Sequence, residues 1–258
     1  MRKIPFAPGV VFVTGATAGF GLAIAHRFAD DGARVVITGR RGELLAKLKA
    51  ELGERAHTLE FDVRDRTAVE AAIASLPPEF AAVDLLVNNA GLALGLEPAH
   101  KADLDEWEAM VDTNVKGLMY CTRTLLPGMV DRDRGHIVNL GSIASQFPYP
   151  GGNVYGATKA FVYQFSLNLR ADLLGTNVRV TDIQPGLCGG TEFSTIRFRG
   201  DAAKADALYA DTTPLDADDV ADAVHWVATR PEHVNINSVQ MMPVVQAFAP
   251  LAVKRSTT

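Results

Sequence analysis

The sequence predicts an α/β fold in which helices cover both faces of a parallel sheet of about seven strands. Two observations support this prediction. Short apolar segments alternate with longer segments of helical character along the whole chain. The apolar segments are hydrophobic throughout, which is typical of strands buried on both faces of a sheet. Because crossovers between parallel strands are right-handed, the strands are expected to form a doubly wound sheet of the Rossmann type.

The elements follow one another in a regular order. Strands are expected at residues 10–13, 35–38, 57–61, 85–87, 137–140, 178–183 and 238–241. Helices are expected at residues 19–31, 43–52, 67–76, 105–129, 154–174 and 216–229. Pro77 and Pro78 end the third helix, because proline lacks the backbone donor that a helix needs.

No linker, repeat or low-complexity segment divides the chain, so residues 1–258 are interpreted as a single domain. Residues 191–215 contain no clear strand and interrupt the alternation after the sixth strand. Segments at this place in an open α/β sheet cover ligands, so residues 191–215 are expected to form a substrate lid. Residues 246–258 are interpreted as a C-terminal tail.

The composition argues against several classes of protein. The net charge is −5 and no basic tract is present, which argues against a nucleic-acid partner. No apolar segment near the N-terminus is long enough to span a membrane. The histidines and the two cysteines show no metal-ligand spacing, so no metal is expected. No signal peptide is recognised, and Cys121 and Cys188 are therefore expected to be free thiols in the cytoplasm.

A glycine-rich turn separates the first strand from the first helix. Its glycines follow the pattern Gly-x-x-x-Gly-x-Gly, whose first gap is one residue longer than in the common dinucleotide-binding sequence. Glycine lets the backbone approach a pyrophosphate, and the helix N-terminus supplies N–H donors. A plain strand-to-helix turn is the alternative, but the flanking strand and helix favour a dinucleotide. The expected contacts are Gly15, Ala16, Thr17, Ala18, Gly19, Phe20 and Gly21.

Polar residues follow the second, third and fourth strands, where such sheets bind cofactors. After the second strand, an NAD site is expected to carry Asp or Glu; Arg40 and Arg41 can instead bind a 2′-phosphate, which favours NADP. Two solvated arginines are the alternative. Asp62 and Val63 after the third strand, and Asn89 after the fourth, are further candidates for cofactor contacts. The asparagine can also simply form a turn.

Tyr155 and Lys159 are the strongest candidates for catalysis. They lie four residues apart in a predicted helix, so their side chains project from one face. A phenol beside an ammonium is a general acid/base, and the cation is expected to lower the tyrosine pKa. Such spacing alone is usually found on helix surfaces. Ser142 after the fifth strand can also be a turn cap, and Asn114 within a predicted helix can be an exposed amide.

Together these motifs resemble those of the short-chain dehydrogenases/reductases from residue 10 to about residue 245. The resemblance implies that Tyr155 is the general acid/base and that Ser142 binds the substrate oxygen. It implies that Lys159 binds the nicotinamide ribose and lowers the tyrosine pKa. It also implies that Asn114 holds a water of the proton relay, and that the protein is a homotetramer.

Within this family, residues 14–21, 88–98, 151–159 and 185–193 resemble the NADP-dependent 3-hydroxy acid dehydrogenases. This implies reversible oxidation of a small 3-hydroxy acid, such as L-serine, L-allo-threonine, 3-hydroxypropionate or 3-hydroxyisobutyrate, by hydride transfer to NADP. Reduction of another carbonyl, such as a 3-oxoacyl thioester or a diketone, is the alternative reaction, and a non-catalytic NADPH sensor is the alternative function. Further cofactor contacts are implied at Pro185, Gly186, Leu187, Gly190, Thr191 and Phe193.

A hydroxy acid brings a carboxylate into the site, and a cation or several donors must meet it. Arg197 and Arg199 in the predicted lid are the first candidates. Lys254 and Arg255 in the tail are the second candidates, if the tail folds back over a site. Any of these side chains could instead be solvated.

Overall fold

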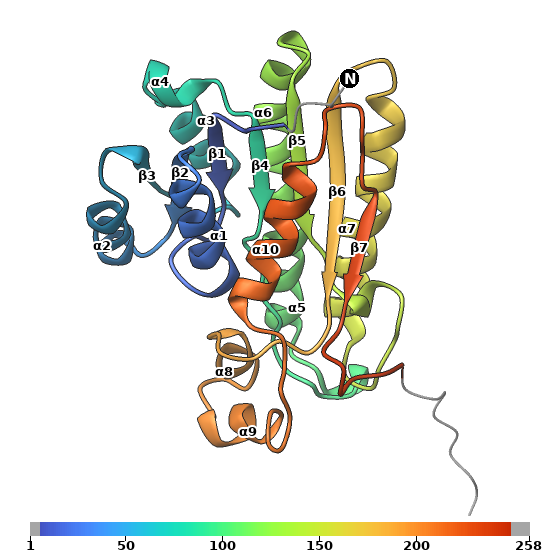
Figure 1. Cartoon of the computed structure of the whole chain (residues 1–258). Helices are drawn as coiled ribbons and strands as arrows, with labels where there is room; N and C mark the ends of the chain where they lie inside the picture. Colours follow the sequence, from blue (N-terminus) through green and yellow to red (C-terminus); the bar gives the residue numbers. More distant parts are fainter. Residues whose placement is uncertain (1–5, 249–258) are drawn as a thin grey trace, which may run out of the picture.

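The computed structural model describes residues 6–248, and its sheet has seven parallel strands in the order β3-β2-β1-β4-β5-β6-β7 (Figure 1). Each new strand is added on one side of β1 up to β3, and the chain then crosses to the other side at β4. This reversal is the topological switch at which open α/β sheets bind ligands. The predicted fold class and the predicted strands are confirmed. The strands are β1 (Val10–Val13), β2 (Arg34–Gly39), β3 (Ala56–Glu60), β4 (Leu85–Asn88), β5 (Gly135–Leu140), β6 (Val178–Pro185) and β7 (Ser238–Met241).

Helices form one layer on each side of the sheet. The helices α1, α2 and α10 cover one face, and α3, α6 and α7 cover the other. The helices are α1 (Gly19–Asp30), α2 (Gly42–Leu52), α3 (Arg66–Ala74), α4 (Pro78–Ala81), α5 (Leu104–Val111), α6 (Leu118–Asp131), α7 (Asn153–Asp172), α8 (Phe193–Arg197), α9 (Ala202–Ala207) and α10 (Ala217–Ala228).

The sheet separates two hydrophobic cores. Val13 of β1 packs in the core that contains Phe28 and Val224 of the α1–α10 layer. Its neighbour Phe12 packs in the core on the opposite face, which contains Met129 of α6. Because successive strand residues point to opposite faces, β1 must be apolar at every position. Each such side chain contributes roughly 1.5–3 kcal/mol by its burial, and this burial fixes the strand ends that carry the site.

The prediction of a single helix at residues 105–129 is wrong in one respect. A π-helical turn, Asp112–Gly117, separates α5 from α6. A Cβ at Gly117 would lie 2.7 Å from Cγ2 of Val63, so only glycine lets this turn pack against the loop after β3. The side chain of Asn114 is hydrogen-bonded away from its own helix, as described below. Turns of this kind occur often at functional sites.

The segment at residues 191–215 contains the two short helices α8 and α9, which lie together below the carboxyl edge of the sheet in Figure 1. An isolated parallel bridge between Cys188 and Leu215 closes the base of the segment. The segment therefore lies at the edge where ligands are expected. Its role as a substrate lid stays a prediction.

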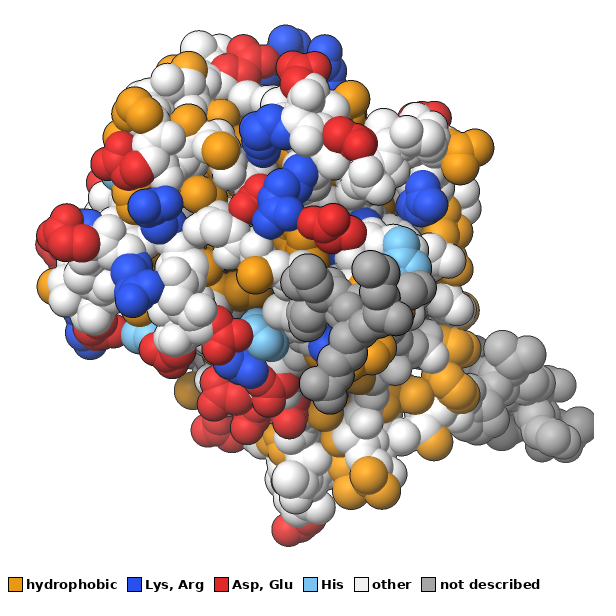
Figure 2. Space-filling model, turned by 45° about the horizontal axis from the view of Figure 1, so that its top comes forward, with side chains coloured by type: hydrophobic (Ala, Val, Ile, Leu, Met, Phe, Trp, Pro, Cys, Tyr) orange, Lys and Arg blue, Asp and Glu red, His pale blue; other side chains and the backbone are white. Residues whose placement is uncertain are grey.

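The surface carries charges of both signs. On the face shown in Figure 2, Lys and Arg side chains are interspersed with Asp and Glu side chains over most of the area. Within residues 6–248, no helix has both the length and the apolar character to cross a membrane. The same residues contain no group of three or more His, Cys, Asp and Glu side chains that could hold a metal ion. Lys254 and Arg255, the tail candidates for binding the substrate, lie outside the described residues.

Candidate active site

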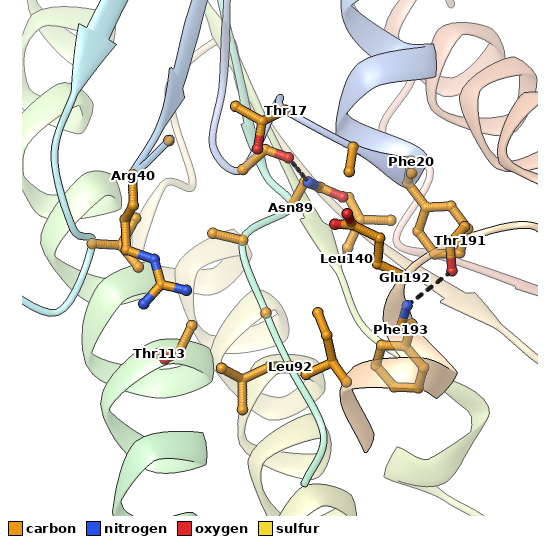
Figure 3. A pocket seen from close by; sticks show the side chains of 18 of the residues that line it. Thr17, Phe20, Arg40, Asn89, Leu92, Thr113, Leu140, Thr191, Glu192 and Phe193 are labelled. Atoms are coloured by element: carbon orange, nitrogen blue, oxygen red, sulfur yellow. Dashed lines mark hydrogen bonds between the residues drawn. The ribbon is translucent and has the colours of Figure 1, made fainter. Parts of the chain in front are cut away.

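A cavity of about 350 Å³ lies at the carboxyl edge of the sheet, beside the switch between β1 and β4. Its walls are the glycine loop, the loops that follow β2 to β5, one face of α7 and the start of the predicted lid. Figure 3 shows Arg40 on one side of the cavity, residues 191–193 on the opposite side, and Asn89 between them. Tyr155 and Lys159 line the same cavity.

The glycine loop turns sharply between β1 and α1. Gly15 and Gly19 have φ angles of 66° and 53°, a region that glycine adopts at little cost. Gly21 packs so closely that a Cβ would overlap with the carbonyl oxygen of Gly15. The helix begins at Gly19, and Ala18 before it supplies no side-chain cap. The first N–H groups of α1 therefore face the cavity without helical partners, which fits a pyrophosphate.

Arg40 and Arg41 both line the cavity. Arg41 donates from Nη2 to Oγ1 of Thr17 (2.9 Å) and from Nη1 to Oε1 of Glu192 (3.0 Å). Nη1 of Arg40 lies 3.5 Å from Oδ2 of Asp62. Both guanidinium groups are more than 40% exposed and are held only by surface partners, so they can turn toward a phosphate. Two cations at this position fit NADP better than NAD.

Asp62 and Asn89 form the floor beside these cations. Nη2 of Arg64 donates to Oδ2 of Asp62 at 2.6 Å. Burial acts to raise the pKa of Asp62, but hydrogen bonds from the side chain and backbone of Arg64 outweigh it and leave the pKa below its usual range. Nδ2 of Asn89 donates to the carbonyl oxygens of Thr14 (2.8 Å) and Gly15 (3.0 Å). Asn89 therefore fixes the glycine loop to the end of β4.

Tyr155 and Lys159 lie on one face of α7, as their spacing predicts, and both are buried. Nζ of Lys159 lies 5.8 Å from the ring centroid of Tyr155 and donates to the carbonyl oxygen of Leu140 at 2.7 Å. Ser142 follows β5, and its Oγ accepts a hydrogen bond from the N–H of Ala144 at 3.1 Å. The hydroxyl proton of Ser142 is not used by that bond, so it can be donated to an oxygen beside Tyr155, with which Ser142 interacts.

Burial dominates the protonation of this pair. It raises the pKa of Tyr155 to about 12, against a hydrogen bond with Ser142 and the charge of Arg197, which lower it. The expectation that Lys159 brings this pKa below its ordinary value is wrong for the protein on its own, because the phenolate loses its hydration. Burial also lowers the pKa of Lys159 to about 8, against the charge of Asp182, which raises it. At neutral pH the phenol is therefore protonated, as a general acid requires.

Asn114 braces the same cluster. Its Nδ2 donates to the carbonyl oxygen of Leu92 (2.8 Å) and to Oγ1 of Thr158 (3.0 Å), and its Oδ1 accepts from the N–H of Leu92 (2.9 Å). A Cβ at Gly91 would lie 3.3 Å from Oδ1 of Asn114 and 3.7 Å from Nζ of Lys159, so Asn114 approaches the lysine. The side-chain amide is used for bracing. The role of Asn114 in holding a water stays a prediction.

The two arginines predicted to bind the substrate lie in different surroundings. Cζ of Arg197 lies 5.5 Å from the ring centroid of Tyr155 and 5.3 Å from that of Tyr149, and its Nη2 donates to Oη of Tyr149 at 2.7 Å. Arg199 instead pairs with Glu106 (2.6 Å) and Glu97 (2.9 Å) and is 53% exposed. The structure thus brings Arg197 to Tyr155, whereas Arg199 ties the predicted lid to α5 and the loop before it.

Several predicted cofactor residues do not line the cavity. Ala16 is buried beneath the glycine loop, where its N–H donates to the carbonyl oxygen of Thr38 at 2.9 Å. The N–H of Leu187 donates to Oε1 of Gln246 at 2.7 Å, so the segment after β7 holds the end of β6. The predicted cofactor residues outside the cavity wall are Ala16, Gly21, Pro185, Gly186, Leu187 and Gly190. The predicted catalytic and substrate residues outside it are Asn114, Ser142, Arg197 and Arg199.

The cavity wall also includes residues that sequence reasoning missed. Most of them are chain neighbours of predicted residues, so extending each motif by two positions finds them. Tyr149 and Asp182 lie outside the wall but act on Tyr155 and Lys159, and they carry no such signal, since only the fold brings them there. The missed wall residues include Leu92, Thr113, Leu140, Gly141, Glu192 and Ile196.

Known proteins share this sequence and architecture. Residues 9–202 match the family described as short chain dehydrogenase. The NADP-dependent 3-hydroxy acid dehydrogenase YdfG of Salmonella typhi is 64% identical over 247 residues, which cover 96% of this chain and 100% of that protein. Serine 3-dehydrogenase of Rhizobium radiobacter is 51% identical over 249 residues, covering 96% of this chain and 99% of that protein.

A solved structure is equally similar. The closed form of a serine dehydrogenase complexed with NADP⁺ is 61% identical, has a TM-score of 0.95, and covers 96% of this chain and 100% of its own. The matched sequence, the strand order, the position of Tyr155 and Lys159 in the cavity wall and the hydrogen bond between Ser142 and Tyr155 agree with one another. The chain belongs to the short-chain dehydrogenase family.

Proposed function

We propose that the protein is an NADP-dependent oxidoreductase that interconverts a small 3-hydroxy acid and its 3-oxo acid. The observation that carries this proposal is the guanidinium of Arg197, which lies 5.5 Å from the ring centroid of Tyr155. A cation beside the acid/base can bind the carboxylate of a short hydroxy acid while the phenol meets its hydroxyl. The names of two close relatives, a 3-hydroxy acid dehydrogenase and a serine 3-dehydrogenase, support this substrate class.

The cavity supports NADP as the cofactor. The uncapped start of α1 suits the pyrophosphate, and Arg40 and Arg41 suit the 2′-phosphate. Lys159 uses one donor on Leu140, which leaves two ammonium protons for the ribose hydroxyls. NADP⁺, when bound, supplies the hydride acceptor.

Tyr155 moves the proton in this mechanism. In the oxidative direction its phenolate takes the proton of the substrate hydroxyl, and in the reductive direction its phenol donates a proton to the carbonyl oxygen. Ser142 donates a hydrogen bond to the same substrate oxygen and stabilises the charge that develops there. Because burial raises the pKa of Tyr155 to about 12, the phenolate becomes more abundant as pH rises, and oxidation is expected to accelerate with it.

A substrate panel tests the proposed function. NADP⁺ reduction would be measured with L-serine, L-allo-threonine, 3-hydroxypropionate and 3-hydroxyisobutyrate. NADPH oxidation would be measured with malonic semialdehyde, a 3-oxoacyl thioester and a diketone. Turnover of the free hydroxy acids supports the proposal, whereas turnover of the thioester or the diketone alone contradicts it. NADPH binding without any turnover would point to a sensor.

We also propose a homotetramer located in the cytoplasm. Phe161 and Phe165 of α7 stack with ring centroids 5.4 Å apart and are only partly buried, and Leu104 and Leu174 are exposed. Apolar residues of this kind on outer helices suit a subunit interface. Sedimentation velocity checks the tetramer, and a monomer at enzyme-assay concentration would contradict it. Free Cys121 and Cys188 suit a reducing compartment, which cell fractionation checks.

A further inference from the structure

A buried acid, Asp182, lies in β6 on the face covered by α7. It is completely buried, and it lies directly opposite Asn139 of β5. Nδ2 of Asn139 donates to Oγ of Ser166 in α7 at 2.8 Å, which shows the face to which Asn139 points. Directly opposite residues in a sheet share a face. Asp182 therefore lies beneath α7, the helix that carries Lys159.

The carboxyl group of Asp182 is only partly satisfied. Its Oδ2 accepts a hydrogen bond from Nε2 of Gln184 at 2.7 Å. Its Oδ1 is buried and has no hydrogen-bond partner among residues 6–248. Leaving a buried polar oxygen unpaired costs on the order of 1–3 kcal/mol, so a group of this kind needs a compensating interaction or a role.

Gly141 makes room for this carboxyl group. A Cβ at Gly141 would overlap with Oδ1 of Asp182 and lie 3.0 Å from its Cγ. Gly141 is flanked by Leu140, whose carbonyl oxygen accepts from Nζ of Lys159, and by Ser142. Asp182 therefore packs against the short segment that holds the lysine on one side and carries the serine on the other.

The charges around the lysine are few. Asp182 is the acid whose charge acts on Lys159, and the charge of Lys159 acts on Asp182 in return. Burial raises the pKa of Asp182 to about 7, while a hydrogen bond from Gln184 and the charge of Lys159 lower it. The other charged and titratable groups in the cluster face the phenol of Tyr155: Tyr149, Arg197 and Cys188.

We propose that Asp182 is a positioning residue, which keeps the ammonium of Lys159 charged and directed at the cavity from beneath the sheet edge. The proposal rests on the proposed function, in which Lys159 binds the cofactor. Asp182 touches neither substrate nor cofactor and acts through Lys159 alone. An uncharged residue at position 182 leaves the buried lysine with the cost of burial and no opposing charge, so the lysine loses its proton at lower pH.

Titration of Lys159 in the cofactor-free protein tests this directly. Lysine side chains labelled with ¹³C would be followed by NMR across pH in the wild type and in Asp182→Asn, and Lys159→Arg would identify the signal. Asparagine keeps the shape of the side chain and its contact with Gln184 but removes the charge. We expect the protonation equilibrium of Lys159 to move at least about tenfold toward the neutral amine, because the loss of a nearby opposite charge in a buried site has effects of this size.

A second variant and a matched control accompany this substitution. Gln184→Met removes the hydrogen bond to Oδ2, which keeps Asp182 protonated to higher pH, so the Lys159 equilibrium should move in the same direction but less far. Asp84→Asn is the control, because Asp84 is a buried acid that precedes β4 at the opposite edge and binds Gly9 and Arg134. It should leave the titration of Lys159 unchanged.

Activity adds an independent readout. If the ammonium is needed, the pH above which kcat declines should be lower in Asp182→Asn than in the wild type, with a smaller change in KM for the hydroxy acid. A Lys159 titration that is the same in the wild type and Asp182→Asn overturns the proposal, even if activity falls. If Asp182→Asn does not fold, an unchanged titration in Gln184→Met overturns it. Failure of the substrate panel would contradict the proposed function alone, since the titration needs no substrate.

Discussion

The cluster of Ser142, Tyr155 and Lys159 and the predicted lid are held in place in different ways. Ser142, Tyr155 and Lys159 are buried, and they extend from β5 and α7, whose backbones are fixed by the sheet and its cores. The residues at 191–215 are held mainly by partly exposed side chains, among them the pairs Arg199–Glu106 and Arg41–Glu192. The first group is therefore held by burial, whereas the predicted lid is held largely by contacts at the surface.

The difference has an energetic reason. Burial costs charged groups their hydration, which moves the pKa of Tyr155 up to about 12 and that of Lys159 down to about 8. Ion pairs in the predicted lid stay hydrated, and such pairs contribute little to stability. Substitutions in the cluster should therefore change the reaction strongly, and substitutions in the lid should change binding and opening moderately.

Tyr155→Phe should have the largest effect on activity of any substitution in the cluster. It should lower kcat by roughly 10²–10⁴-fold, because the phenol hydroxyl is the proton carrier. The ring still fills its place, so the affinity for NADPH should stay within about threefold of the wild type by the same reasoning. Steady-state rates and titration of cofactor fluorescence measure the two effects. A variant that keeps more than about a tenth of the wild-type kcat would remove Tyr155 from this role.

Substitution of the two arginines expected to bind the 2′-phosphate should have the next largest effect, on cofactor affinity. The double substitution of Arg40→Ala and Arg41→Ala should weaken NADP⁺ binding by about 1.5–3 kcal/mol for each phosphate contact that is lost. The loss should lie near the lower value, because both arginines are partly exposed. NAD⁺ binding should hardly change, since NAD⁺ lacks the 2′-phosphate. Isothermal titration with both cofactors measures this, and equal losses would reject the assignment.

Arg197→Ala is expected to act mainly on substrate binding, and the loss of its charge should also raise the pKa of Tyr155. It should raise KM for a hydroxy acid by about tenfold, as one charge-assisted contact is worth roughly 1.4 kcal/mol, and should raise KM less for an uncharged alcohol. Arg199→Ala, two residues further along the chain, is the matched control, because the guanidinium of Arg199 already binds Glu97 and Glu106. If Arg199→Ala changes the ratio of the two KM values more than Arg197→Ala does, the roles are reversed.

Arg199→Ala should have the smallest effect on the fold itself. The guanidinium side of its ion pairs with Glu97 and Glu106 is solvent-exposed, so their loss should lower the melting temperature by only a few degrees. The same variant should release the predicted lid and increase proteolytic cleavage within residues 191–215. Thermal unfolding and limited proteolysis measure the two effects. A large loss of melting temperature would mean that the lid belongs to the core of the fold.

Most of the fold could be predicted because continuous apolar strands alternate regularly with helices. Apolar segments such as β1 are continuous, and helices alternate with them, so the strand sites and fold class follow from hydrophobicity alone. The break at Asp112–Gly117 could not be predicted, since it depends on contacts with Val63 and Leu92 that are distant in sequence. Local propensity detects poor helix formers there but does not decide between a bend and a π-helical turn.

Site features that depend on residues close together in the sequence could be predicted, and those that depend on distant contacts could not. Tyr155 and Lys159 share a helix face, and their spacing therefore predicts that they act together. Their pKa directions depend on burial, which spacing does not report, so the expected low pKa of Tyr155 was wrong. The separate surroundings of Arg197 and Arg199 arise from Tyr149, Glu97 and Glu106. Tyr149 and Glu106 lie in no motif, and the motif that contains Glu97 does not indicate its pairing with Arg199.

Transfer of a labelled hydride tests the central claim most directly. The protein would be incubated with NADP⁺ and L-serine carrying deuterium at C3, and the reduced cofactor would be examined by mass spectrometry. The account predicts deuterium in NADPH, its loss in Tyr155→Phe, and little transfer to NAD⁺. Absence of label from the reduced cofactor with L-serine and with every other 3-deuterated hydroxy acid of the panel, while a 3-oxoacyl thioester is reduced, would contradict the account.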